Sequence, residues 1–171
     1  MLFSGKHGKE QKIEQLLTEN YNRYYRLAMS YVHNGADAAD IVQNGAYRAI
    51  LHSGDLKGEA YAATWLYRIM LNEIFRHLQK TPQDICRDTG EDGGPEAGTE
   101  DAGLAHACEN MDLQRALDAM TPKDKAVIAL RFFEERKLEE IAVILEENVS
   151  TVKSRLYRGL KKLRVELGED A

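Results

Sequence analysis

The sequence predicts an all-α protein of two small helical domains joined by a flexible acidic linker. Apolar residues recur at intervals of three and four, the period of a helix with one buried face, and no alternating strand pattern stands out. Only three prolines occur among 171 residues, so long helices are rarely interrupted. A change in composition over 81–110 then separates a domain expected at 10–80 from one expected at 111–168.

Composition limits the class of protein. The chain is 43% hydrophobic and 30% charged, with a net charge of -5. It has no run of 18 apolar residues, so we expect no membrane insertion. The N-terminus lacks the apolar core of a signal peptide, and Cys86 and Cys108 do not form a CxxC pair. These features predict a cytoplasmic protein without a disulfide framework.

Three helices are expected in the first domain. Residues 1–10 read as a frayed polar leader, and apolar spacing then predicts a helix from Ile13 to about His33. A second helix is expected to start at Asp37, a residue type that caps helices, and to reach the loop at 52–58. The third helix is expected over 61–80.

The segment 81–110 has the composition of a linker. It contains five glycines and eight acidic residues against the single cation Arg87. So few large apolar side chains cannot offset the entropy lost on ordering, and we expect the segment to be flexible.

The second domain is expected to hold four helices. A short helix starts near Met111, and Thr121, Pro122 and Asp124 form a strong start for the next, with Thr as N-cap and Pro in the first turn. That helix is expected to bury Phe132 or Phe133 near its end. A short helix over 138–145 and a longer basic helix after the cap Asn148 complete the domain, and we read this pair as a helix-turn-helix.

The last helix has one apolar and one cationic face. Its apolar residues fall in one narrow arc: Val149, Val152, Leu156, Leu160 and Leu163. Between Asn148 and Val165 there are six cations and no acid. Such a face on an acidic protein indicates a polyanionic partner, with the helix entering the major groove of DNA. The alternative is a helical hairpin with a solvated basic face.

The segment EIAVILEENVSTVKSRLYRGLKKLR resembles the helix-turn-helix (region 4) of bacterial sigma factors, especially the extracytoplasmic-function (ECF) group. The run from Thr151 to Leu156 carries most of the likeness. That family usually has Gly where Glu146 stands, so Glu146 must make the turn without glycine's conformational freedom. The resemblance implies major-groove contacts in the minus-thirty-five element by Thr151, Ser154, Arg155 and Arg158. It implies phosphate contacts by Lys153, Lys161, Lys162 and Arg164.

Residues 24–80 also resemble the sigma family, over most of region 2. The match at Asp37 to Gln43 implies that Asp37, Asp40 and Gln43 bind polymerase. The match at Trp65 to Ile69 and Asn72 implies that Trp65, Tyr67, Arg68, Asn72 and Arg76 contact the minus-ten element, where aromatic, Arg and Asn side chains suit unpaired bases. From the residues alone, Trp65 is most simply a core anchor, and the polar residues read as an ordinary solvated surface.

Three hypotheses remain: a sigma factor, a helix-turn-helix regulator that is not a polymerase subunit, and a helical interaction protein with an incidental basic face. The first implies core RNA polymerase, promoter DNA and an anti-sigma protein as partners. We find no P-loop, HExxH or GxSxG motif and expect no enzyme activity. His106 and Cys108, with the distant Cys86, lack the paired spacing of a zinc site, so we expect no metal or cofactor.

Overall fold

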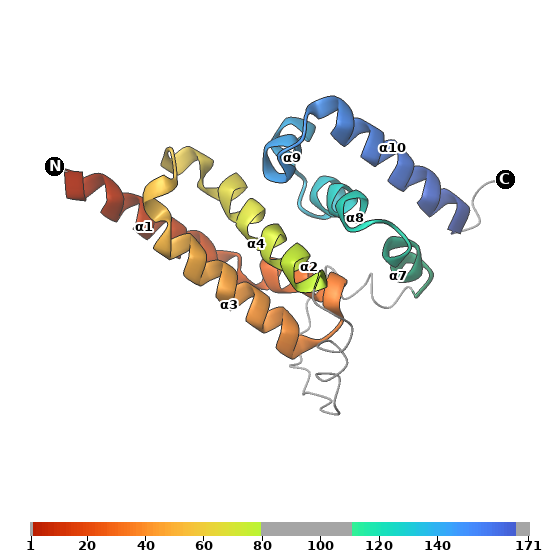
Figure 1. Ribbon diagram of the computed structural model, residues 1–171, viewed down its shortest axis with the longest axis horizontal. Helices are drawn as coiled ribbons and strands as arrows, with labels where there is room; N and C mark the ends of the chain where they lie inside the picture. The colour runs from red at the N-terminus through yellow and green to blue at the C-terminus, as the bar shows by residue number, and fades with distance from the viewer. Residues whose placement is uncertain (1, 80–110, 167–171) are drawn as a thin grey trace. The chain divides into compact units, whose positions relative to one another are not determined.

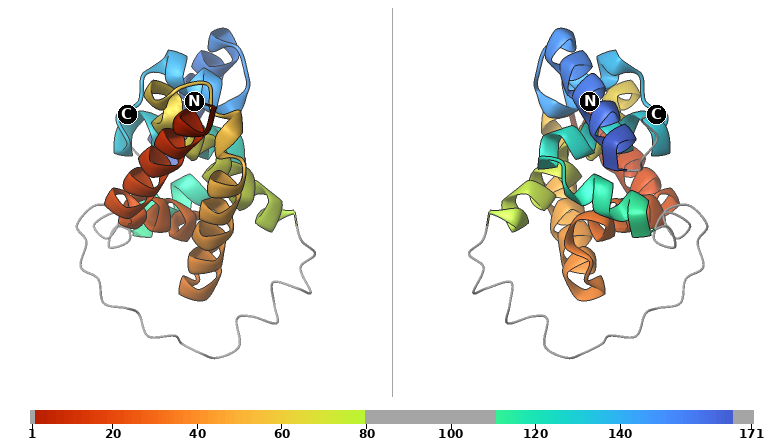
Figure 2. Two further views of the ribbon diagram at one scale, coloured as in Figure 1. Left: turned by 90° about the vertical axis from the view of Figure 1, so that its left-hand side faces the viewer. Right: turned by 90° about the vertical axis from the view of Figure 1, so that its right-hand side faces the viewer.

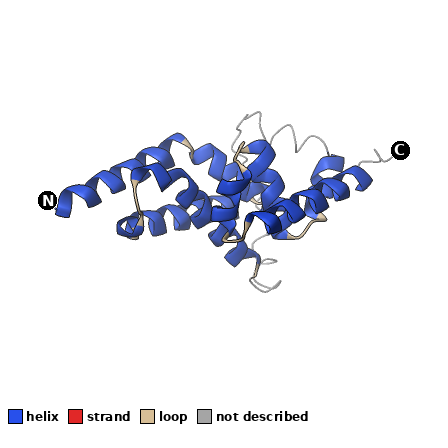
Figure 3. Ribbon diagram, turned by 90° about the horizontal axis from the view of Figure 1, so that it is seen from above, coloured by secondary structure: helices blue, strands red, loops and turns tan. Residues whose placement is uncertain are grey.

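A computed structural model describes residues 2–79 and 111–166, and these residues form helices joined by short turns, with no strand among them (Figures 1 and 3). The chain divides into two compact units, Met1–Thr99 and Glu100–Ala171. The all-α prediction is confirmed. The expected linker, with Cys86, His106 and Cys108, lies outside the described residues.

The first unit is a helical bundle in which α3 and α4 run side by side and α2 packs against both (Figures 1 and 2). Its core includes Tyr24, Leu27, Ile41, Leu66 and Ile74, each less than 4% exposed. Its elements are α1 (Leu2–Glu19), α2 (Tyr21–Val32), α3 (Gly35–Leu51), the 3₁₀ turns η1 (Ser53–Asp55) and η2 (Glu59–Tyr61), and α4 (Ala62–Leu78).

The start of the chain differs from expectation. Helix α1 begins at Leu2, so the prediction of a frayed leader over 1–10 is wrong; α1 packs against η1 and α4, and this packing stabilises it. The single helix predicted from Ile13 is two helices that meet at Asn20. The Asn20 amide donates to the Leu16 carbonyl at 3.0 Å, and such side-chain bonds compete with helix continuation.

The cap of α3 also differs by one turn. Asn34, not Asp37, is the N-cap: its side-chain oxygen accepts a hydrogen bond from the Asp37 backbone N–H at 3.0 Å. His33 ends α2 in the left-handed region, with φ of 53°. Both Asn and Asp cap helices well, so composition did not distinguish the two positions.

Gly45, inside α3, allows the close approach of α4. A Cβ at this position would lie 2.6 Å from the Met70 sulfur. Glycine costs about 1 kcal/mol in a helix interior relative to alanine. The close packing of α3 on α4 therefore depends on a residue that intrinsically weakens α3.

In the second unit, α10 packs against α7 and α8 (Figure 2). Leu156, Leu160 and Leu163 lie against a buried cluster that includes Met120 and Ile128. Thr121 is the N-cap of α8, as predicted, and accepts from the Asp124 backbone N–H. The elements are α7 (Met111–Asp118), α8 (Pro122–Ile128), the π-helical turn η3 (Ala129–Phe133), α9 (Leu138–Leu145) and α10 (Val149–Glu166).

The turn between α9 and α10 has the predicted geometry despite its missing glycine. Glu146 adopts φ of 57° and ψ of 44°, the left-handed conformation in which glycine is favoured. Asn148 caps α10, because its side-chain oxygen accepts from the Thr151 N–H at 2.9 Å. In η3 it is Phe133 that is half-buried, while Phe132 is 53% exposed.

Candidate functional site

Helix α10 presents most of its predicted DNA-contacting residues to solvent. Ser154 is exposed, and Arg158 is 59% exposed. Thr151 is half-buried, and its hydroxyl donates to the Asn148 side chain at 2.8 Å. The four predicted phosphate contacts are all exposed: Lys153, Lys161, Lys162 and Arg164.

Arg155 differs from its neighbours because its guanidinium is bonded within the unit. Its Nε and Nη2 donate to the two Glu147 carboxylate oxygens at 2.7 and 2.9 Å, and its Nη1 donates to Asp124 Oδ1 at 2.9 Å. These bonds raise the pKa of Arg155 and lower the pKa of Glu147, the Glu147–Arg155 hydrogen bonds being the largest cause of each shift. A base contact would require Arg155 to give up these partners, so we leave it out of the proposed base-contacting set.

Tyr157 is a surface residue of α10 that the sequence analysis did not single out. Its side chain is 67% exposed, and it lies on the helix between Ser154 and Arg158. An aromatic ring outside the apolar arc is the signal that could have identified it, because the ring gains nothing from the core there.

Helix α4 separates the predicted minus-ten residues into two groups. Trp65, Arg68, Asn72 and Arg76 recur at three and four positions along one face and are half-buried or exposed. Tyr67 is 3% exposed and packs edge-on against Tyr24, with ring centroids 5.6 Å apart. Its ring cannot stack on a base without leaving the core, so we also leave Tyr67 out of the proposed set.

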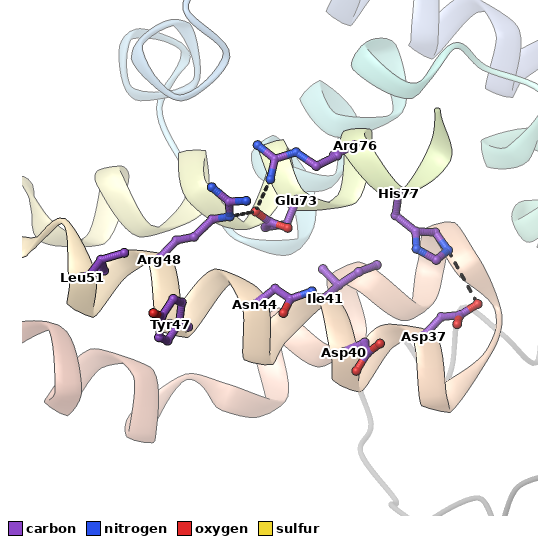
Figure 4. Close-up of a pocket in the computed structure, with 10 residues that line it drawn as sticks. All are labelled: Asp37, Asp40, Ile41, Asn44, Tyr47, Arg48, Leu51, Glu73, Arg76 and His77. Atoms are coloured by element: carbon purple, nitrogen blue, oxygen red, sulfur yellow. Dashed lines mark hydrogen bonds and ion pairs between the residues drawn. The ribbon is translucent and has the colours of Figure 1, made fainter. Parts of the chain in front are cut away.

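A pocket of about 550 Å³ lies between α3 and α4 and brings together residues from two predicted sites (Figure 4). Asp37 and Asp40, predicted to bind polymerase, line it together with Arg76, predicted to contact the minus-ten element. Glu73 also lines the pocket, and its carboxylate is 6% exposed and pairs with both Arg48 and Arg76. This buried carboxylate thus holds one arginine from each helix.

The predicted polymerase-binding residues differ in their surroundings. Asp37 is half-buried, and its carboxylate lies 3.6 Å from Nε2 of His77 on α4. Asp40 and Gln43 are exposed. Asp40 is therefore the carboxylate of the pair that a partner can reach without displacing a contact to α4 (Figure 4).

Two exposed apolar side chains lie on the same side of α3 as Asp40. Tyr47 and Leu51 also line the pocket, and they are 66% and 58% exposed. Together with Asp40 and Asn44 they recur at intervals of three and four, which places them on one face. Exposed apolar residues on such a face indicate a protein partner, and this spacing was visible in the sequence.

No helix in the described ranges is long and apolar enough to cross a membrane.

Comparison with known proteins identifies the family. Residues 16–82 match the model described as Sigma-70 region 2, and residues 110–163 match Sigma-70, region 4. The chain is 37% identical over 166 residues to RNA polymerase sigma factor SigV of Bacillus subtilis. This match covers 95% of this chain and 97% of the relative. It is 31% identical to ECF RNA polymerase sigma factor SigE of Mycolicibacterium smegmatis, over 88% of this chain and 60% of the relative.

Two solved structures share the fold. One is CnrH in complex with the cytosolic domain of CnrY, with a TM-score of 0.69 and 21% identity, covering 98% of this chain and 95% of that chain. The other is the sigma factor RpoE in complex with the anti-sigma factor NepR from Bartonella quintana, also with a TM-score of 0.69 and 21% identity, covering 92% and 98%. With both sigma regions present in order along one chain, the protein belongs to the ECF group of RNA polymerase sigma factors.

Proposed function

We propose that this protein binds core RNA polymerase, directs it to specific promoters and promotes DNA melting for transcription initiation. The observation that carries the proposal is the presence of both sigma regions in one chain, with an α3 face suited to a protein partner and an α10 face suited to DNA. A regulator that only binds DNA needs α10 but not the α3 face. Initiation on this account requires no catalytic residue in the chain, because the polymerase supplies the chemistry.

Helix α3 is the proposed polymerase-docking element. Asp40 and Gln43 are exposed, and Asp37 lies beside them at the edge of the pocket. An acidic, partly apolar helix face suits a basic helix of the polymerase, since complementary charge steers the encounter and apolar contact adds affinity.

One face of α4 is proposed to contact the unpaired bases of the minus-ten element. Trp65, Arg68, Asn72 and Arg76 share this face, and aromatic and guanidinium planes can stack on unpaired bases while an amide bonds a base edge. Stacking and hydrogen bonding of extruded bases offset the few kcal/mol needed to unstack each step.

Helix α10 is the proposed minus-thirty-five reader. Thr151, Ser154 and Arg158 are proposed to meet base edges, and four surrounding cations, all exposed, are proposed to meet phosphates: Lys153, Lys161, Lys162 and Arg164. The acidic segment 81–110 is proposed to connect the two units through basic channels of the polymerase. An anti-sigma protein that covers the two units is the proposed regulator, and the cytoplasm, where polymerase works, is the proposed location.

Gel filtration with core polymerase tests this proposal against a DNA-binding regulator. We expect the full chain to co-elute with core polymerase in the absence of DNA. A regulator would elute separately under these conditions and would still bind duplex DNA in a salt-dependent way.

A further inference from the structure

Asp124 is a buried carboxylate of α8 that contacts two arginines of the recognition helix. Its side chain is only 4% exposed. Its Oδ1 accepts a hydrogen bond from Arg155 at 2.9 Å, and its Oδ2 lies 3.4 Å from Nε of Arg158. A carboxylate removed from water needs charged or hydrogen-bonding partners, so Asp124 favours the presence of both guanidinium groups beside it.

The two arginines are exposed to very different degrees. The Arg155 side chain is 19% exposed, and its three guanidinium nitrogens bond to Asp124 and Glu147. The Arg158 side chain is 59% exposed, and its contact with Asp124 is made through Nε. The terminal amino groups of Arg158 can therefore donate to a second partner while Nε stays against Asp124.

This arrangement suits the recognition of guanine. An arginine reads guanine with two parallel N–H groups directed at O6 and N7 in the major groove. A long side chain loses rotamer freedom when it makes such a contact, and that loss reduces affinity unless the side chain is already ordered. A fixed carboxylate against Nε orders the guanidinium before DNA arrives.

We propose that Asp124 is a positioning residue for promoter recognition: it holds Arg158 with its terminal N–H groups directed toward a guanine of the minus-thirty-five element. This inference rests on the proposed function of α10. Asp124 is buried and negatively charged, so it acts on DNA through Arg158 and makes no contact of its own. Its contribution therefore belongs to sequence discrimination and not to general attraction for phosphate.

The test compares reconstituted holoenzymes carrying wild-type protein, Asp124→Asn, Arg158→Ala or both changes. The probes are a promoter duplex selected by wild-type holoenzyme and the same duplex with its minus-thirty-five element scrambled. The readout is the ratio of the two affinities. Asparagine matches the shape of aspartate: its oxygen can still accept from Arg155, while its N–H₂ group faces the Arg158 donor and ends that contact.

We expect Asp124→Asn to lower the ratio roughly tenfold, the order of one bidentate base contact. Affinity for the scrambled duplex should stay the same or rise, because a negative charge near the DNA is removed. In the Arg158→Ala background, Asp124→Asn should cause no further loss of the ratio, since it acts through that residue.

Glu147→Gln is the matched control, because it weakens the hold on Arg155 and leaves the Asp124–Arg158 contact in place. It should lower the stability of the unit and keep the ratio. An equal loss of the ratio in Glu147→Gln, or an additive loss in the double variant, would show that Asp124 is only structural and would overturn the inference.

If Asp124→Asn does not fold, Asp124→Glu displaces the carboxylate by one methylene and must lower the ratio only where Arg158 is present. An unchanged ratio in that variant also overturns the inference. Failure of the proposed function gives a different result, because wild-type holoenzyme would then fail to discriminate between the two duplexes.

Discussion

Glu147 and Arg155 are joined by two parallel hydrogen bonds, from Nε to Oε1 at 2.7 Å and from Nη2 to Oε2 at 2.9 Å. Glu147 lies in the turn before α10, and Arg155 lies two turns into that helix. The pair therefore ties the turn to the recognition helix at a point where the chain has no glycine. A bidentate Arg–carboxylate pair is among the stronger polar contacts in proteins.

This pair predicts an acid-dependent stability. The Arg155 hydrogen bonds lower the pKa of Glu147 in the folded state. The stabilisation is therefore complete above the unfolded-state value of about 4.3 and is lost as pH falls through the lower folded value. Glu147→Gln should destabilise the second unit by about 1 kcal/mol at about pH 7. The difference from wild type should shrink as pH falls below about 4.3 and through the lower folded-state pKa.

Hydrogen exchange of α8 and α10 amides across this pH range measures the effect. The Trp65 fluorescence, from the only tryptophan of the chain, reports the first unit and serves as the internal control. A difference that stays constant with pH would show that the charge of Glu147 does not contribute.

Glu146 predicts a stabilising change. Its φ of 57° costs a non-glycine residue about 1 kcal/mol or more, and glycine avoids this cost while losing more entropy on folding. Glu146→Gly should stabilise the second unit by about 0.5 kcal/mol. Glu146→Ala removes the same carboxylate but keeps a Cβ, so it should bring no gain; equal effects of the two changes in hydrogen exchange would rule out backbone strain.

Gly159 sets how closely α10 approaches α8. A Cβ there would lie 3.0 Å from two side-chain atoms of Ile128. Gly159→Leu should therefore destabilise the second unit by about 1–3 kcal/mol through overpacking. Gly54→Leu is the control, because a Cβ at Gly54 meets nothing within 4 Å. Ile128→Ala should cost less in the Gly159→Leu background than alone, and strictly additive losses in urea unfolding would argue against the contact.

Replacing each of two buried serines of the first unit by alanine should change its stability in opposite directions. The Ser53 hydroxyl is fully buried, with no hydrogen-bond partner among the described residues, whereas the Ser30 hydroxyl donates to the Leu27 carbonyl at 2.7 Å. Ser53→Ala should stabilise the unit by about 1 kcal/mol, and Ser30→Ala should destabilise it by about the same amount. Urea titration followed by Trp65 fluorescence measures both. A loss on Ser53→Ala would reveal a partner for that hydroxyl.

A charge reversal at Asp40 tests the proposed docking of α3 on polymerase. Its carboxylate is exposed on α3, so reversing its charge should leave the helix intact while placing a cation against a basic partner. Asp40→Arg should abolish co-elution with core polymerase with no change in circular dichroism. Glu14→Arg, an exposed reversal on α1, should still co-elute, and retained binding by Asp40→Arg would remove Asp40 from the interface.

Local chemistry made much of the fold predictable. The Thr121 and Asn148 caps and the apolar arc of α10 follow from residues within one or two turns of each other, whereas the turn at Glu146 was expected from the family resemblance. The break at Asn20 and the cap at Asn34 were missed because asparagine is compatible with several local conformations. Tertiary packing selects one of these conformations, and the sequence does not show that packing.

The candidate site was less predictable because its residues pair over long distances in the chain. Arg155 reads from the sequence as one more cation of a basic helix, and its partner Asp124 lies 31 residues away. Arg48 of α3 likewise pairs with Glu73 of α4, which also pairs with Arg76 one turn away. Tyr67 is different, since helical periodicity alone places it opposite the face of Trp65 and Asn72.

Run-off transcription with core polymerase on a promoter library measures whether the protein confers promoter selectivity. We expect that adding the protein makes core polymerase start at a small set of promoters sharing minus-thirty-five and minus-ten elements. If core polymerase with the protein starts no more selectively than core polymerase alone, the proposed function is contradicted.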